Sequence, residues 1–243
     1  MPRINPSLLA LATCGALLAA CGGAGNDAVP KSSAVAFANA VNLRGGDLQG
    51  MTTLLPGFET TNGPPFGSCA TELGPSDEVA SVESTWFLRS RSQQTGYLRL
   101  HVLPRVEGTH SIVYVMRGPG VANRNVAAAR RVGAAGCVQR LSVGESSGRL
   151  VGREPYKRQI EASSLPFPLS GVTGYGLRVR GTLAAALYHQ KERPTYYEDT
   201  FGFAVGPAEI VLDTIGVDGR FPPATERRLL SLLYDRARAR ALS

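Results

Sequence analysis

The sequence contains few cysteines and few histidines, and each scarcity excludes a class of protein. Four cysteines in 243 residues are too few for a fold that depends on a disulfide scaffold. The three histidines, His101, His110 and His189, lie far apart and lack the spacing of metal ligands such as His-x-x-x-His, so we expect no metal site. The sequence also lacks a phosphate-binding Gly-x-x-x-x-Gly-Lys loop and a dinucleotide fingerprint, and we therefore expect no cofactor.

The composition is otherwise that of an ordinary folded protein. Hydrophobic residues make up 43% and charged residues 19%, a balance that supports a buried core and excludes a largely disordered chain. The 28 glycines and 16 prolines predict many turns. The formal net charge of +7 comes mainly from arginine, and beyond the first 20 residues no apolar run is long enough to cross a bilayer.

The first 21 residues have the pattern of a lipoprotein signal peptide. Arg3 is the only charged residue before Asp27, and the apolar stretch that follows Arg3 is too short to span roughly 30 Å of hydrocarbon. Small residues at positions 19 and 20 precede Cys21, as cleavage by the lipoprotein signal peptidase requires. The sequence therefore predicts acyl chains, palmitate among them, on Cys21 and anchoring at the outer face of the cell membrane. The alternative is an ordinary secretory signal peptide with an incidental cysteine.

This pattern divides the chain into a signal peptide at 1–20, a lipidated flexible tether at 21–33 and one α+β domain at 34–243. We expect the domain to lie outside the cytoplasm, which excludes nucleic acid as a partner and lets thiols oxidise. Cys14 leaves with the signal peptide and Cys21 carries lipid, so Cys69 and Cys137 remain and most simply form one disulfide. Two buried thiols and a reactive cysteine are the alternatives.

The periodicity of the remaining residues predicts an alternation of helices and antiparallel strands. Helical spacing of apolar residues predicts helices over 33–41, over 122–135, and from Pro222 onward with Leu230, Leu233, Ala237 and Ala241 facing inward. Strands are predicted at 79–88, 97–103, 111–116 (ended by Pro119-Gly120), 157–162, 177–183, 196–205 and 209–212. The last two strands form a hairpin around Gly206-Pro207. The fold class is therefore α+β, a single antiparallel β-sheet flanked by helices.

Several stretches resemble a known group of envelope proteins. They are Val41–Leu48, Ser111–Val115, the cysteine after the second helix (Cys137), Phe203–Gly206 and Thr225–Leu233. By layout, the chain resembles the extracytoplasmic lipoproteins of high-GC Gram-positive bacteria and the extracellular sensor domains joined to some mycobacterial Ser/Thr kinases. The resemblance implies a PsbP-like α/β/α sandwich and ligand sensing or carriage in the envelope, and it supplies no catalytic residues.

Two patterns favour enzymatic chemistry only weakly. Ser146 lies in a Gly-x-Ser-x-Gly match at 144–148, but no helix pattern follows it and the downstream order of His189 and the acids is wrong for a hydrolase triad. Glu198 and Asp199 are adjacent in a predicted strand and therefore point to opposite faces. We expect no enzymatic activity, and a serine hydrolase using Ser146 is a distant alternative.

Two other patterns are candidates for binding. Basic residues gather in the middle of the chain and suit anionic lipid headgroups or wall polymers, although solvated surface arginines explain them more simply; they are Arg124, Arg130, Arg131, Arg140, Arg149, Arg153, Lys157 and Arg158. Aromatic residues on the strands are candidates to line an apolar ligand pocket, or else belong to the core; they are Trp86, Tyr175, Tyr188, Tyr197, Phe201 and Phe203. The sequence thus predicts a non-catalytic, ligand-binding lipoprotein, with a protein-interaction scaffold that has no small ligand as the alternative.

Overall fold

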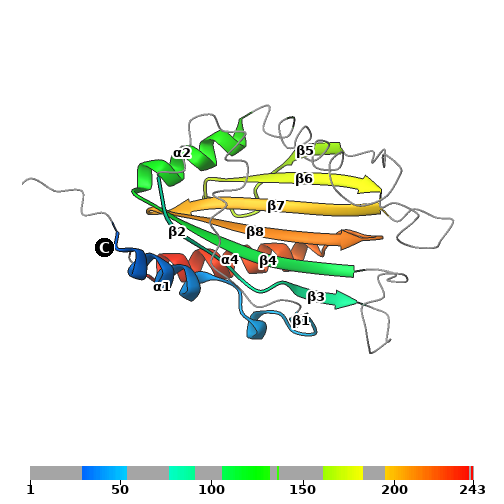
Figure 1. Ribbon diagram of the computed structural model, residues 1–243. Helices are drawn as coiled ribbons and strands as arrows, with labels where there is room; N and C mark the ends of the chain where they lie inside the picture. The colour runs from blue at the N-terminus through cyan, green and yellow to red at the C-terminus, as the bar shows by residue number, and fades with distance from the viewer. Residues whose placement is uncertain are drawn as a thin grey trace, which may run out of the picture.

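The computed structural model describes residues 29–53, 77–90, 106–131, 136, 161–182, 195–240 and 242. Its helices are α1 (Lys31–Val41), the short 3₁₀ helix η1 (Gly45–Asp47), α2 (Pro119–Arg130) and α4 (Pro223–Arg238). Its strands are β1 (Thr52–Thr53), β2 (Glu78–Glu83), β3 (Phe87–Ser90), β4 (Val106–Met116), β5 (Glu161–Leu165), β6 (Gly174–Thr182), β7 (Thr195–Val205) and β8 (Ala208–Val217). Figure 1 shows these elements as one sheet with helices packed on it, which confirms the α+β prediction.

The strands form one antiparallel sheet in the order β1-β3-β4-β8-β7-β6-β5. β2 and β3 both pair with the same edge of β4, β3 along its first half and β2 along its second. The chain between them, residues 84–86, leaves the ladder and carries Trp86. The strand predicted over 79–88 is therefore two strands separated by a short break.

Helices cover the two faces of this sheet unequally (Figure 1). On one face, α1 and α4 bury a continuous aliphatic and aromatic core against the inward side chains of β2, β4, β7 and β8. This surface is called the α1/α4 face below. On the other, the α2 face, α2 packs on two small clusters around Tyr175 and Tyr114. Successive residues of each strand alternate between the faces, so each strand contributes to both.

Most predicted elements are present, with shifted ends. The hairpin of β7 and β8 turns at Gly206-Pro207, where Gly206 has φ +56°, a conformation that glycine adopts without strain. α4 begins at Pro223, where a missing N–H costs nothing, and buries Leu230, Leu233 and Ala237 as predicted. Ala241 and the strand predicted over 97–103 lie outside the described residues.

Two predicted boundaries are wrong. Pro119 does not merely end a strand: it begins α2, because proline has no N–H to lose at the first helical position and its φ already suits a helix. The strand predicted over 111–116 starts five residues earlier, at Val106, because pairing with β8 continues to that residue. In the part of the chain that the structure describes, no helix combines the length and apolarity needed to span a membrane.

Candidate functional site

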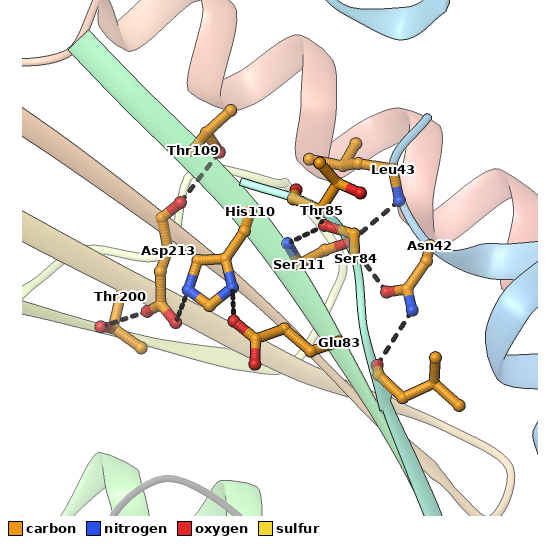
Figure 2. A network of polar contacts seen from close by, with 11 residues as sticks. Asn42, Leu43, Glu83, Ser84, Thr85, Thr109, His110, Ser111, Thr200 and Asp213 are labelled. Carbon is orange, nitrogen blue, oxygen red and sulfur yellow. Dashed lines mark hydrogen bonds and ion pairs between the residues drawn. The ribbon is translucent and has the colours of Figure 1, made fainter. Parts of the chain in front are cut away.

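A row of polar side chains crosses the α2 face beyond the area that α2 covers. In the antiparallel register His110 of β4 lies opposite Asp213 of β8, and Asp213 lies opposite Thr200 of β7. β2 approaches from the other side of β4 and brings Glu83 to the same histidine (Figure 2). We call these four residues and Trp86 the His110 cluster.

Both ring nitrogens of His110 contact carboxylates. Nδ1 lies 2.7 Å from Oε1 of Glu83, and Nε2 lies 3.1 Å from Oδ2 of Asp213. The Thr200 hydroxyl donates a hydrogen bond of 2.6 Å to the other oxygen of Asp213. His110 is only 6% exposed, and the Trp86 ring stacks on it with centroids 3.8 Å apart.

This arrangement keeps His110 protonated. Burial alone disfavours the cation, but the close contacts with Asp213 and Glu83 outweigh it and raise the pKa of His110 to about 9. A charged imidazole between two carboxylates and under an indole ring is well stabilised. Its two nitrogens are occupied, so the ring offers no free nitrogen to deprotonate a nucleophile.

The described neighbours of His110 form neither a nucleophile–base pair with it nor a metal-binding group. The Thr200 hydroxyl is directed to Asp213 rather than to His110, so the two do not form a nucleophile–base pair. Burial and the charge of Asp213 raise the pKa of Glu198, which accepts a hydrogen bond from the Tyr196 hydroxyl on the same strand. Among the residues described, no three His, Cys, Asp or Glu side chains are grouped to hold a metal ion.

The polar contacts on the opposite face are structural. Asn42, at the end of α1, donates a hydrogen bond of 2.9 Å to the carbonyl of Val82 and accepts one of 2.8 Å from the Ser111 hydroxyl (Figure 2). The Ser111 hydroxyl in turn accepts a hydrogen bond from the backbone N–H of Leu43, and the backbone N–H of Ser111 donates to the hydroxyl oxygen of Ser84. This network fixes the end of α1 against β2 and β4.

A pocket of about 390 Å³ lies where the C-terminal end of α2 meets the β5–β6 hairpin. We call it the α2 pocket. Its walls are Ala129 and Arg130 of α2 and the segments 164–167 and 172–176. They combine a cationic side chain, hydroxyl groups and apolar side chains.

The inner wall of the α2 pocket is connected to a buried acid. Tyr175 lines the pocket, and its hydroxyl donates a hydrogen bond of 3.3 Å to Oε1 of Glu209, which lies beneath α2. The side-chain amide of Asn125, on α2, donates a hydrogen bond of 3.0 Å to the other carboxyl oxygen of Glu209. Burial raises the pKa of Glu209 to about 7, although these two hydrogen bonds partly oppose the rise.

A second buried acid, Glu226, belongs to the first turn of α4 and faces the opposite side of the sheet. Glu226 accepts a hydrogen bond of 3.0 Å from the Thr214 hydroxyl. Burial, together with the charge of Asp199, raises the pKa of Glu226 to about 7. Arg178 holds Asp199 in a bidentate pair. Asp199 and Glu198 thus lie on opposite faces of β7, as their adjacency in the strand predicts.

Another pocket, of about 350 Å³, lies between η1 and the start of α4. Its two arginines already have partners: Arg89 pairs with Glu107, and Arg228 donates 2.9 Å to the carbonyl of Asp47. Arg236 adds two bonds of 2.8 Å to the carboxylate of Asp47. These contacts attach α4 to η1, and they leave the α2 pocket as the stronger candidate for a ligand.

The structure does not bring the predicted aromatic residues together. Phe201 and Phe203 are core residues of the α1/α4 face, whereas Tyr175 lies on the α2 face. Tyr197 lies beneath Arg220, with the guanidinium 5.4 Å from its ring, and Trp86 covers His110. Tyr197, Phe201 and Phe203 share one face of β7, whereas Tyr175 and Trp86 lie on the other face of the sheet, so the described aromatic residues line no common cavity.

Several predicted site residues lie outside the described residues: Cys21, Cys69, Cys137, Ser146, Tyr188, His101 and His189. Of the basic residues predicted to form a patch, Arg124, Arg130 and Arg131 are exposed on or just after α2, and the others are not described. The lipid anchor, the disulfide and the hydrolase motif therefore stay predictions.

Sequence reasoning missed the groups with the most unusual environments. Glu209 interrupts the apolar run from Ala208 to Leu212, and a carboxyl inside such a strand was a usable signal. The sequence around Glu83 and Asp213 contains no comparable signal, because only the order of the strands in the sheet brings these two residues to His110.

Comparisons with known proteins give little guidance. No protein-family model matches the chain, and no curated protein matches it in sequence. Among solved structures, the chain is similar to the extracellular domain of PknH from Mycobacterium tuberculosis, with 9% identity, a TM-score of 0.49 and coverage of 89% of this chain and 100% of that one. A similarity of this size is too low to assign a family or to transfer a function.

Proposed function

We propose that this protein is a non-catalytic lipoprotein of the cell envelope, anchored at the outer face of the membrane through lipid on Cys21, whose domain binds a small ligand. The observation that carries the proposal is the α2 pocket. Its volume of about 390 Å³ lies in the range of small-molecule sites, roughly 300–1,000 Å³. The occupied nitrogens of His110 favour a binding role over catalysis at the His110 cluster.

The walls of the pocket favour an amphiphile with an anionic head and a short apolar part. Arg130 supplies a guanidinium, which suits carboxylate, sulfate or phosphate. Ser164 and Thr173 add hydroxyl donors, and Phe167 and Val172 supply an apolar wall. An envelope lipid or one of its fragments has this chemistry.

The anchor is tested by replacing Cys21 with alanine and fractionating the cells. The variant should leave the membrane fraction, because it has no thiol for the acyl chains. Cys14→Ala is the matched control: this cysteine lies in the predicted signal peptide, so the protein should stay in the membrane fraction. Retention of the Cys21 variant contradicts the anchor.

The ligand is tested by native mass spectrometry of the full chain purified from its own envelope at pH 6. We expect a small molecule to accompany the protein, and Thr173→Trp, which fills the α2 pocket from an exposed position, should remove it. Thr52→Trp, at an exposed position on β1, is the control. A bare polypeptide in every sample contradicts ligand binding and favours the scaffold alternative.

A further inference from the structure

The α2 pocket and helix α2 share one buried carboxyl group. Glu209 is 1% exposed and contacts the helix through Asn125 and the pocket wall through Tyr175. Ala129 and Arg130, at the end of the same helix, form the opposite wall of the pocket. Any movement of α2 away from Glu209 therefore changes the shape of the pocket.

The packing beneath α2 is thin. The helix buries only small side chains against the sheet, Ala122, Val126 and Ala129, in two clusters separate from the main core. Its buried polar residue, Asn125, leaves Oδ1 without a hydrogen-bond partner among the described residues. A helix held by few apolar contacts and an imperfect polar one is the kind of element that opens locally before the rest of the fold.

Among the described residues no cation faces Glu209, so only the hydrogen bonds from Asn125 and Tyr175 offset its burial when it is ionised. α2 contributes the neutral Asn125, β4 contributes Tyr114 directly opposite in register, β6 contributes Tyr175 and β7 contributes Ala204. Both tyrosines have pKa values raised by burial, so they stay neutral. Ionised Glu209 is therefore stable only if water reaches it.

We infer that Glu209 is a pH-sensitive latch for helix α2, which docks and forms the α2 pocket when Glu209 is protonated and loosens when Glu209 is ionised. The part that concerns ligand release rests on the proposed function, whereas the loosening of α2 does not. With a pKa of about 4.5 when α2 is loosened and about 7 when it is docked, Glu209 weakens docking progressively as pH rises from about 4.5 through 7.

The test is hydrogen–deuterium exchange of the full chain in lipid nanodiscs at pH 6.0 and pH 8.5, corrected for the intrinsic pH dependence of exchange. With a pKa of about 7 when docked and about 4.5 when loosened, linkage predicts that opening of α2 rises about tenfold between these values. α1, which buries no titratable group, serves as the internal reference. Unchanged protection of α2 relative to α1 overturns the latch.

Two isosteric variants separate this effect from other titrations. Glu209→Gln keeps the shape but not the charge and, like a protonated carboxyl, accepts at one atom and donates from the other, so α2 should stay protected at both pH values. Glu226→Gln, which removes the charge of the buried acid in the first turn of α4, is the matched control. It should leave the pH dependence of exchange in α2 unchanged. The wild-type pH series does not depend on either variant, so poor folding of one leaves the test intact.

The same measurement with hexyl sulfate, an amphiphile that stays anionic at both pH values, tests the connection to the pocket. We expect the probe to slow exchange of residues 161–177 at pH 6.0 but several-fold less at pH 8.5, and Glu209→Gln should restore the effect. An equal effect at both pH values overturns the coupling. No effect at either pH, with α2 still loosening, contradicts the proposed ligand pocket and leaves the latch supported.

Discussion

The two faces of the sheet are built from the same strands but differ in what they bury. The α1/α4 face has a continuous core in which Val113, Phe203, Ile210 and Leu230 are fully buried. The α2 face has two small clusters, and between and beyond them lie buried polar and ionisable groups, Glu209 and His110 among them.

This difference separates stability from responsiveness. A large apolar core contributes free energy that varies little with pH, because it contains few groups that titrate. A face with buried acids and a buried imidazolium has a stability that follows their protonation. We therefore expect substitutions of apolar residues in the α1/α4 core to change the stability of the whole domain. Substitutions of the buried ionisable groups, Glu209 and His110 on the α2 face and Glu226 on α4, should change its dependence on pH.

The largest expected effect is on the core. Phe203→Ala, at a fully buried position, should lower the free energy of unfolding by about 3–5 kcal/mol through lost burial and a cavity. Val126→Ala beneath α2 should cost about 1–2 kcal/mol, because it removes two methyl groups from a small cluster. Urea denaturation measures both. Equal losses in the free energy of unfolding for the two variants would contradict the difference between the two faces.

The next effect concerns the His110 cluster. A folded pKa of about 9 against about 6.5 unfolded stabilises the fold fully below pH 6.5, and this contribution, of the order of 3 kcal/mol, disappears as pH rises through 9. His110→Gln should remove it. Denaturation curves between pH 8 and pH 9.5, above the pKa values of about 7 of Glu209 and Glu226, should then slope for the wild type and be nearly flat for the variant. A slope that survives in His110→Gln assigns the effect to another group.

A smaller effect is expected at Gly202, on the α2 face opposite Tyr175 in the register. A Cβ at this position would lie 2.3 Å from the Tyr175 ring, so Gly202→Ala should displace the ring and cost about 1–3 kcal/mol. It should also reduce the effect of hexyl sulfate on residues 161–177. Gly46→Ala, which meets no atom within 4 Å, is the control and should change neither quantity. Normal stability of Gly202→Ala would mean that Tyr175 is loosely held.

The smallest effect is expected for an exposed ion pair at the sheet edge. Arg180 and Glu161 lie 3.7 Å apart, and their side chains are 55% and 73% exposed. Arg180→Ala should therefore change the free energy of unfolding by less than about 0.5 kcal/mol and leave its pH dependence intact. A larger change, or a different pH profile, would show that surface charges also contribute to the response assigned to the α2 face.

Local signals predicted much of the fold because they depend on neighbours in sequence. The alternation along 196–205 and the Gly206-Pro207 turn were sufficient for the β7–β8 hairpin, and Pro223 with the leucines after it was sufficient for α4. The candidate site was less accessible. The spacing of His110 from the other histidines indicated no site, and the described partners of His110 come from β2 and β8, which no local pattern connects.

The sequence by itself determined the strands, the helices and the two sides of each strand, because these follow from periodicity and from turn residues. Only the tertiary structure decided which groups meet. The order β2-β4-β8-β7 brings Glu83, His110, Asp213 and Thr200 together, and the docking of α2 encloses Glu209. The physical reason is that the burial and charge of a side chain depend on strands that are distant in the chain, and these set its pKa.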